Sequence, residues 1–252
     1  MKLTGRVAVV TGSSRGIGKA IALAFAGAGA DVAVVARTDE PDSRIPGTIN
    51  ETAEQIRAMG RRCLPVKTDL TQQSDIDEMA ARVLSEFGRV DILVNNAGIN
   101  QVSSLLETSV KRWDLVMSVN LRAPFLCTRA LLPQMIKQGG GHIMNTSAES
   151  GSTYVSVENN SVCYSVSKAG VDRFTTGLAW ELKDSNIAVN SLVPGYTLTE
   201  GVRIKVRDLS GHKWDDPSEW GKYAVQLAAL APGAISGKIL TLGEMRKLFP
   251  GL

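Results

Sequence analysis

The sequence predicts an α/β fold of the doubly wound type, with a mostly seven-stranded parallel sheet and helices on both faces. Two observations predict it. Short β-branched runs alternate with longer helical patches along the chain, and the strand-like runs are apolar on both faces. A strand that is apolar throughout must be covered on both sides, as happens when helices flank a parallel sheet. No repeat, low-complexity segment or linker divides the 252 residues, so we predict one domain, 1–252.

Each element follows from its local pattern. The run RVAVVT opens the sheet, and small apolar residues at helical spacing follow it. Pro65 gives the third strand an irregular or edge character. Two stretches lack periodicity: 38–48, an inserted loop, and 198–219, where we expect a substrate lid. The predicted strands are 6–11, 31–36, 62–69, 91–96, 141–147, one within 186–195, and 238–242; the predicted helices are 16–28, 51–60, 75–88, 118–137 and 164–183.

Composition excludes several classes of function. The net charge of +3 comes from scattered basic residues, which gives no case for binding nucleic acid or a membrane surface. Cys63, Cys127 and Cys163 lack metal-ligand spacing and are odd in number, so we expect reduced, mostly buried thiols and no metal. The start MKLTGRVAVVTG lacks signal-peptide architecture, and no apolar run reaches about 18 residues. We therefore expect a cytoplasmic protein without a transmembrane helix.

A glycine-rich loop, TGSSRGIG, directly follows the first strand. Gly12, Gly16 and Gly18 allow a tight turn and a close approach to a diphosphate, and the helix that begins there directs its N–H groups at the anion. Three glycines alone could simply make a turn. Between a first strand and a helix of small residues, they indicate a nucleotide site.

The residues around this loop favour NADP(H) over NAD(H). An NAD site usually has an acidic residue at the end of the second strand, where this chain has Ala36 followed by Arg37. Arg15 lies inside the glycine loop. Two guanidinium groups near the ribose suit a 2′-phosphate, although both could also be ordinary surface arginines.

Further blocks recur in a characteristic order: TGSSRGIG, DL at 69–70, NNAG at 95–98, Asn120, YSVSK at 164–168 and PGYTLT at 194–199. The ordered set resembles the short-chain dehydrogenase/reductase family and covers nearly the whole chain. The inserted loop, with its PGTI segment, is also similar to that of the hydroxysteroid dehydrogenase-like branch. The resemblance implies a three-layer Rossmann fold and a nicotinamide cofactor.

The resemblance also implies roles for individual residues. Asn95 would stabilise the central strand, and the other residues would contact parts of the cofactor. The diphosphate and adenosine phosphate would be held by Gly12, Ser14, Arg15, Gly16, Ile17 and Gly18; the adenine by Asp69 and Leu70; the middle of the cofactor by Asn96, Ala97 and Gly98; and the nicotinamide end by Pro194, Gly195, Thr197 and Thr199.

Tyr164 and Lys168 lie four residues apart on a predicted helix and so share one face. A free phenol has a pKa near 10, and a nearby ammonium lowers that pKa. Tyr164 could then exchange a proton with a carbonyl or alcohol oxygen while a hydride moves to or from the cofactor. In the family the lysine also holds the nicotinamide ribose, and Asn120 would position a water in a proton relay.

One group should donate a hydrogen bond to the substrate oxygen. The family pattern, Asn-x-Ser-Ser-x-x-Gly, aligns with NTSAESG so that Ala148 takes the place of the usual serine. Three readings stay open. Ser147 could supply the hydroxyl, which the hydroxysteroid dehydrogenase-like branch favours; Ser150 could do so from a rebuilt loop; or neither does.

We expect a small carbonyl or alcohol substrate, apolar or aromatic, because of the residues in segments that line the family's substrate cleft: Tyr154, Val155, Val157, Tyr196 and Trp214. The family forms homodimers or homotetramers through two long helices, here 118–137 and 164–183, so we expect a homo-oligomer. The alternative, prompted by Ala148, is a weakly catalytic NADP-binding regulatory or structural protein.

Overall fold

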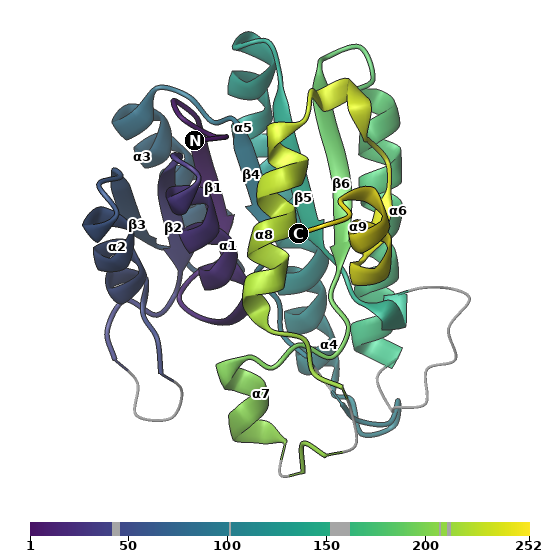
Figure 1. The fold of residues 1–252 in the computed structure, drawn as a ribbon. Coiled ribbons are helices and arrows are strands. Elements are labelled where there is room, and N and C mark those ends of the chain that lie inside the picture. The colour runs from purple at the N-terminus through teal and green to yellow at the C-terminus, as the bar shows by residue number, and fades with distance from the viewer. Residues whose placement is uncertain (42–45, 101, 152–161, 207, 211–212) are drawn as a thin grey trace.

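The structure, a computed structural model, describes residues 1–41, 46–100, 102–151, 162–206, 208–210 and 213–252. Its parallel strands form one seven-stranded sheet in the order β3-β2-β1-β4-β5-β6-β7 (Figure 1). This confirms the predicted fold class. The strand order reverses between β1 and β4, where such sheets bind ligands at their carboxyl ends. The strands are β1 Val7–Thr11, β2 Asp31–Ala36, β3 Cys63–Lys67, β4 Ile92–Asn95, β5 Gly141–Thr146, β6 Ile187–Val193 and β7 Ile239–Thr241.

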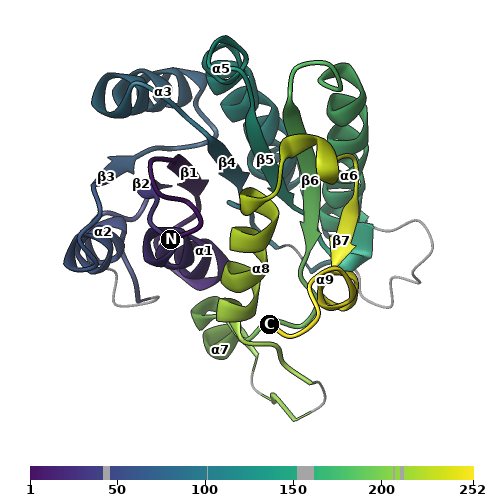
Figure 2. The ribbon, with the colours of Figure 1, turned by 45° about the horizontal axis from the view of Figure 1, so that its top comes forward.

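Helices cover both faces of the sheet (Figure 2). Their bounds are α1 Gly16–Gly27, α2 Ile49–Ala58, α3 Gln73–Phe87, α4 Val110–Met117, α5 Ala123–Lys137, α6 Val162–Glu181, α7 Glu200–Lys205, α8 Pro217–Ala229 and α9 Leu242–Leu248. On one face, Phe25 of α1 and Trp220 of α8 pack on the sheet; on the other, Met79 of α3 and Leu131 of α5 do so. Alternate strand residues therefore reach two separate cores, which explains why the strands are apolar on both faces.

Three regions differ from the prediction, one of them the final helix α9, which sequence analysis did not predict. The expected helix at 118–137 is part of a longer run, in which the π-helical turn Ser118–Arg122 joins α4 to α5. The stretch 198–219, expected to lack periodicity, contains the short helix α7 and the start of α8, and sequence analysis did not predict α8. The π turn places Asn120 on the inner side of the run, fully buried.

The run Val110–Lys137 is long and apolar enough to cross a membrane by length and composition, with a mean hydropathy of 1.3. Several of its apolar side chains are buried in the core on the α3 side of the sheet, among them Leu126, Leu131 and Met135. Packing against the sheet therefore accounts for much of its apolar character.

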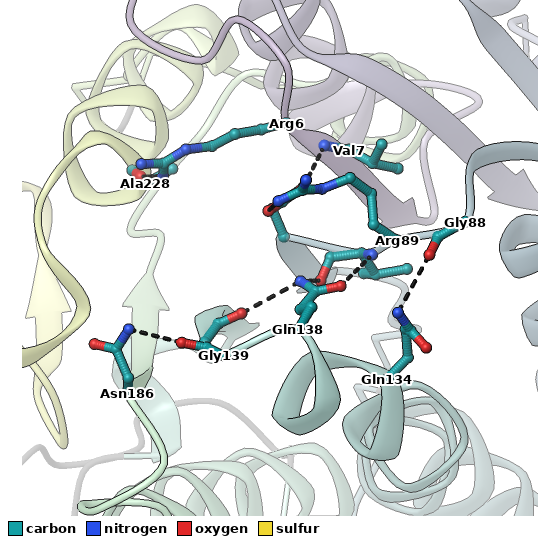
Figure 3. A network of polar contacts seen from close by, with 12 residues as sticks. Arg6, Val7, Gly88, Arg89, Gln134, Gln138, Gly139, Asn186 and Ala228 are labelled. Carbon is teal, nitrogen blue, oxygen red and sulfur yellow. Dashed lines mark hydrogen bonds and ion pairs between the residues drawn. The ribbon is translucent and has the colours of Figure 1, made fainter.

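A polar network closes the amino ends of the central strands (Figure 3). Asp91 accepts hydrogen bonds from Arg89 at 2.8 and 2.6 Å and from the Val7 amide at 2.8 Å. Gln138 of the α5–β5 turn donates to the Val90 carbonyl at 2.6 Å. The donors and acceptors at this end thus pair with one another, whereas a cavity opens at the other end.

Candidate active site

A cavity of about 690 Å³ lies at the carboxyl ends of the strands. It is walled by nearly all the residues that the sequence assigned to the cofactor and to proton transfer: Gly12, Ser14, Arg15, Gly16, Ile17, Arg37, Asp69, Leu70, Asn96, Ala97, Gly98, Ser147, Tyr164, Lys168, Pro194, Gly195, Thr197 and Thr199. Gly18, Asn120 and Ser150 do not line it. Sequence reasoning did not single out Thr38, Thr68, Ile99, Asn100, Val119, Thr146, Gly201, Val202 and Val206, which do.

The glycine loop is held in a conformation that leaves no room for side chains. A Cβ at Gly18 would lie 2.4 Å from the Gly12 carbonyl oxygen, and a Cβ at Gly12, whose φ is +68°, would lie 2.8 Å from the Ala97 Cα. Gly18 therefore allows close packing and does not face the cavity. Ser13 fixes the loop by donating to the Val10 carbonyl at 2.8 Å and accepting from the Val35 amide at 2.9 Å. The loop fits a diphosphate cradle at the start of α1.

The first amide of α1 already has an anionic partner. The Gly16 N–H donates to the Glu200 carboxylate, at the start of α7, over 2.8 Å. Helix N-termini favour negative charge, so this contact shows the electrostatic preference of the cradle. Sequence reasoning missed Glu200, although an acidic residue directly after Thr199 was a visible signal.

The part of the cavity beside the end of β2 carries positive charge. Arg37, exposed, follows β2 and lines the cavity together with Ala36 and Arg15. Asp39 forms an ion pair with Lys67 at 3.0 Å. Arg15 donates to the backbone carbonyls of Pro46 and Gly47 at 2.9 and 2.8 Å, so its guanidinium is held against the segment before α2.

Polar side chains bind the central strands together beneath the cavity. Asn95 donates to Asn145 at 2.9 Å across β4 and β5, and Asn145 donates to Thr175 of α6 at 2.9 Å. This agrees with the strand-stabilising role implied for Asn95. Asn96 instead donates to the Thr11 carbonyl at 3.0 Å and fixes the glycine loop to the neighbouring strand.

Asn120 is engaged by the protein itself. Its Oδ1 accepts from the Ile99 amide at 2.8 Å, and its Nδ2 donates to the Ile99 carbonyl and to Ser167, each at 3.0 Å. The side chain thus clamps the loop after β4 onto α6. A Cβ on Gly98 would lie 3.5 Å from both Asn120 Oδ1 and Lys168 Nζ, so the two groups lie on the same side of this loop.

Tyr164 and Lys168 share one face of α6, as predicted, but burial dominates their pKa values. Burial raises the pKa of Tyr164 to about 12. Burial also lowers the pKa of Lys168 to about 8, and the charge of Asp172 partly opposes that shift. Lys168 Nζ lies 5.7 Å from the Tyr164 ring centroid and donates to the Thr146 carbonyl at 2.6 Å. The pKa of Tyr164 is therefore higher than that of a free phenol, and the expected lowering by the charge of Lys168 stays a prediction.

The structure separates the two candidate serines. Ser147, directly after β5 and 2% exposed, lies in the cavity wall. Its hydroxyl donates to the Lys168 carbonyl at 3.3 Å and also hydrogen-bonds Asp172. Burial raises the pKa of the Asp172 carboxyl, and the hydrogen bond from Ser147 partly opposes that shift. Ser150 lies outside the cavity, and its buried hydroxyl has no partner among the described residues. Its position in the cavity wall favours Ser147 as the donor to the substrate oxygen. Its single hydroxyl proton, however, already has two acceptors, the Lys168 carbonyl and Asp172.

Two aromatic side chains form another part of the cavity wall. The rings of Tyr196 and Trp214 meet edge to face, with centroids 5.7 Å apart, and both line the cavity. Trp214 Nε1 donates to the Leu209 carbonyl at 2.7 Å. Tyr154, Val155 and Val157, predicted for the same cleft, lie outside the described residues.

The cysteines behave as structural residues. Burial raises the pKa of Cys63 and of Cys127 to about 12, which keeps both thiols protonated. Within the part of the chain that the structure describes, no group of three or more His, Cys, Asp or Glu side chains is placed to hold a metal ion.

Comparisons with known proteins match this architecture. The family model for short chain dehydrogenase matches residues 6–209. Hydroxysteroid dehydrogenase-like protein 2 of Danio rerio is 37% identical over 233 residues, covering 92% of this chain and 54% of the relative. An uncharacterized oxidoreductase of Thermotoga maritima is 38% identical over 207 residues, 82% of this chain and 78% of that protein. The chain thus spans about half the length of the hydroxysteroid dehydrogenase-like relative it matches.

One solved structure that resembles this chain contains a bound cofactor. A proposed NAD(P)-dependent gluconate 5-dehydrogenase from Beutenbergia cavernae, with NADP bound at low occupancy, aligns with a TM-score of 0.82 and 33% identity and covers 98% of both chains. The chain therefore belongs to the short-chain dehydrogenase family. The resemblance inferred from the motifs, including the likeness to the hydroxysteroid dehydrogenase-like branch, is confirmed.

Proposed function

We propose that this chain is an NADP(H)-dependent oxidoreductase that interconverts a ketone or aldehyde and an alcohol. The observation that carries the proposal is the convergence of Tyr164, Lys168 and Ser147 on the wall of one cavity whose other end is the glycine loop. The cofactor would supply or accept the hydride at its nicotinamide ring. The protein's own residues must then move one proton and stabilise the charge on one oxygen.

Tyr164 is the group that transfers the proton. A phenol with a pKa of about 12 remains protonated at neutral pH, so Tyr164 is in the right state to donate to a carbonyl oxygen. In the reverse direction, oxidation of an alcohol would need the phenolate. Lys168 holds the nicotinamide ribose and stabilises charge that develops on Tyr164, and Asn120 acts by holding the loop at Ile99 beside them.

Ser147 is the donor that polarises the carbonyl in this proposal. It lines the cavity where Ser150 does not. To donate to a substrate oxygen, its hydroxyl must turn from the Lys168 carbonyl and Asp172 toward the cavity. The Ser147→Ala variant should lower turnover, with Ser150→Ala as the matched control. The opposite result would move the role to Ser150.

The cofactor is NADP(H) in preference to NAD(H). Ala36 leaves the end of β2 without a carboxylate, and Arg15 and Arg37 both line the cavity there. The Beutenbergia relative with NADP bound supports the same preference. Equal or tighter binding of NADH would overturn it.

The substrate is a small apolar or aromatic carbonyl compound. Apart from Tyr164, the cavity has an apolar wall formed by Tyr196, Trp214, Val202 and Val206. The test is NADPH oxidation with a panel of ketones, aldehydes and quinones, run with NADH in parallel. Turnover with an apolar ketone supports the proposal, and turnover confined to polar sugars contradicts the substrate class.

A second candidate is an NADP-binding protein with little catalysis. Ala148 and the engaged Ser147 hydroxyl favour it, because Ser147 cannot donate to a substrate oxygen until its hydroxyl turns from the Lys168 carbonyl. Such a protein would bind NADPH tightly and consume none with any carbonyl compound. Calorimetry of NADPH binding beside the turnover assay distinguishes the two.

We also propose that the protein is a cytoplasmic homo-oligomer. Exposed apolar side chains lie along the two long helices: Phe125 and Ile136 on α5, and Val162, Val166 and Trp180 on α6. Burying such surface between copies is favourable. Light scattering at micromolar concentration should give a dimer or tetramer, and a monomer would contradict this part.

A further inference from the structure

The segment between the inserted loop and α2 touches the glycine loop through Arg15. Arg15 Nε donates to the Pro46 carbonyl at 2.9 Å, and Nη2 donates to the Gly47 carbonyl at 2.8 Å. Two bonds from one planar group to neighbouring carbonyls fix the plane as well as the position of the guanidinium. The direction of Arg15 is therefore set by backbone atoms that lie 31 and 32 residues away in sequence.

The absence of a side chain at Gly47 allows this segment to lie against Ser14 and Arg15. Its φ is +100°, a conformation that a residue with a side chain rarely adopts. A Cβ at this position would lie 2.5 Å from the Ser14 carbonyl oxygen and 3.2 Å from the Arg15 Cβ. The first contact is with backbone, which cannot move aside as a flexible side chain could. A side chain at position 47 must push the segment away from Arg15.

Further contacts make the segment a firm support. Thr48 caps α2 by accepting from the Glu51 amide at 3.0 Å, and Glu51 bonds back to the Thr48 amide at 3.2 Å. Thr52, fully buried, donates to the Ser13 carbonyl at 3.0 Å. The start of α2 is thus tied to Ser13, two residues before Arg15.

We infer that Gly47 is a specificity-determining position, which holds the Arg15 guanidinium in the orientation that recognises a 2′-phosphate on the adenosine ribose. The inference rests on the NADP(H) preference proposed above. It adds that the preference depends on a residue remote from β2, where the usual acidic or basic determinant lies. A charge-assisted hydrogen bond to phosphate depends on geometry, so a displaced arginine loses affinity while its charge remains.

The test compares two ligands that differ by the 2′-phosphate alone, 2′,5′-ADP and 5′-AMP, by calorimetry. Wild type should bind 2′,5′-ADP more tightly. In Gly47→Ala this preference should fall about tenfold, the loss expected for a charge-assisted hydrogen bond, while 5′-AMP affinity stays within about twofold. Gly139→Ala is the matched control: Gly139 has φ +92°, lies at the other end of the sheet, and its Cβ would meet nothing within 4 Å.

A double-mutant cycle shows whether Gly47 acts through Arg15. Arg15→Ala should lose the preference, and adding Gly47→Ala should cause no further loss. If Gly47→Ala does not fold, Thr52→Val removes the contact to Ser13 without a clash and should weaken the preference by a smaller factor. A wild-type protein that binds both ligands equally would overturn the proposed NADP(H) preference together with this inference. A preference that survives in Gly47→Ala, or in Thr52→Val where that variant replaces it, would overturn this inference alone.

Discussion

The two ends of the sheet use similar polar side chains in opposite ways. At the amino end, Arg89 donates to Asp91, Asp91 also accepts from the Val7 amide of β1, and Gln138 bonds to the Val90 backbone (Figure 3). At the carboxyl end, Tyr164 and Lys168 line a cavity, and their pKa values are set by burial. The first arrangement satisfies polar groups in place, and the second keeps groups at a surface where a ligand can meet them. We therefore expect substitutions at the amino end to change stability and substitutions at the carboxyl end to change activity.

The largest effect should come from Tyr164→Phe. Removing the phenol oxygen removes the proposed proton donor, so turnover should fall about 100-fold or more. The free energy of unfolding should hardly change, because the ring remains. Tyr223→Phe, on α8 away from the cavity, is the matched control and should keep wild-type turnover. Steady-state kinetics and urea unfolding of both variants check this, and a Tyr164→Phe variant with normal turnover would contradict the assignment.

Asp91→Ala should lower the free energy of unfolding and leave turnover unchanged. It leaves the buried Val7 amide without its acceptor and Arg89 without its partner, and should cost about 2–3 kcal/mol of unfolding free energy. The expected readout is a lower urea midpoint with an unchanged slope, and normal turnover per folded molecule. Arg89→Ala should cost less, since that side chain is 49% exposed. Equal losses in both variants would mean that the Val7 contact contributes little.

The amino end should also govern acid stability. His142, on β5, is 3% exposed, and burial, aided by the charge of Arg6, lowers its pKa to about 4. Because the unfolded state binds this proton near pH 6.5, the folded state loses stability as the pH falls from 6.5 toward 4. The loss between pH 7 and pH 5 should be about 2 kcal/mol.

The His142→Gln variant should remove that part of the pH dependence. Gln Nε2 can still bond the Leu230 carbonyl, which His142 Nε2 meets at 3.2 Å. Urea unfolding at several pH values compares the two proteins. Parallel curves for wild type and variant would mean that other groups dominate acid unfolding.

The strands and the glycine loop were predictable because they follow local rules, whereas most of the cavity wall was implied by the resemblance to the family. Apolar runs predict strands buried on both faces, and the glycine spacing marks the loop that cradles an anion. What was missed depends on contacts distant in sequence. The pairing of Glu200 with the Gly16 amide, and of Arg15 with Gly47, requires loops that meet only after folding. The bonds of the Asn120 side chain to the Ile99 backbone and to Ser167 were also not predicted, while its role in positioning a water stays a prediction.

The Tyr164 pKa shows a second limit. The spacing to Lys168 is readable from sequence, but the depth of burial is not, and here burial outweighs the neighbouring charge. The placement of the two candidate serines relative to the cavity was equally hidden. The alignment left Ser147 and Ser150 open, and only the end of β5 places Ser147 in the cavity wall.

The smallest predicted effect concerns Asp172, the carboxylate one turn beyond Lys168 on α6. It accepts from Ser191 at 2.9 Å, and its charge opposes the burial that lowers the pKa of Lys168 to about 8. If the proposed role requires a protonated Lys168, turnover falls as the pH rises through about 8. Asp172→Asn removes the charge and lowers the pKa of Lys168 further, so this decline should begin at lower pH, while Asp184→Asn, on the exposed surface, should leave it in place. Profiles that coincide for wild type and Asp172→Asn would show that the carboxylate only pairs with its neighbours, as charges do at the amino end.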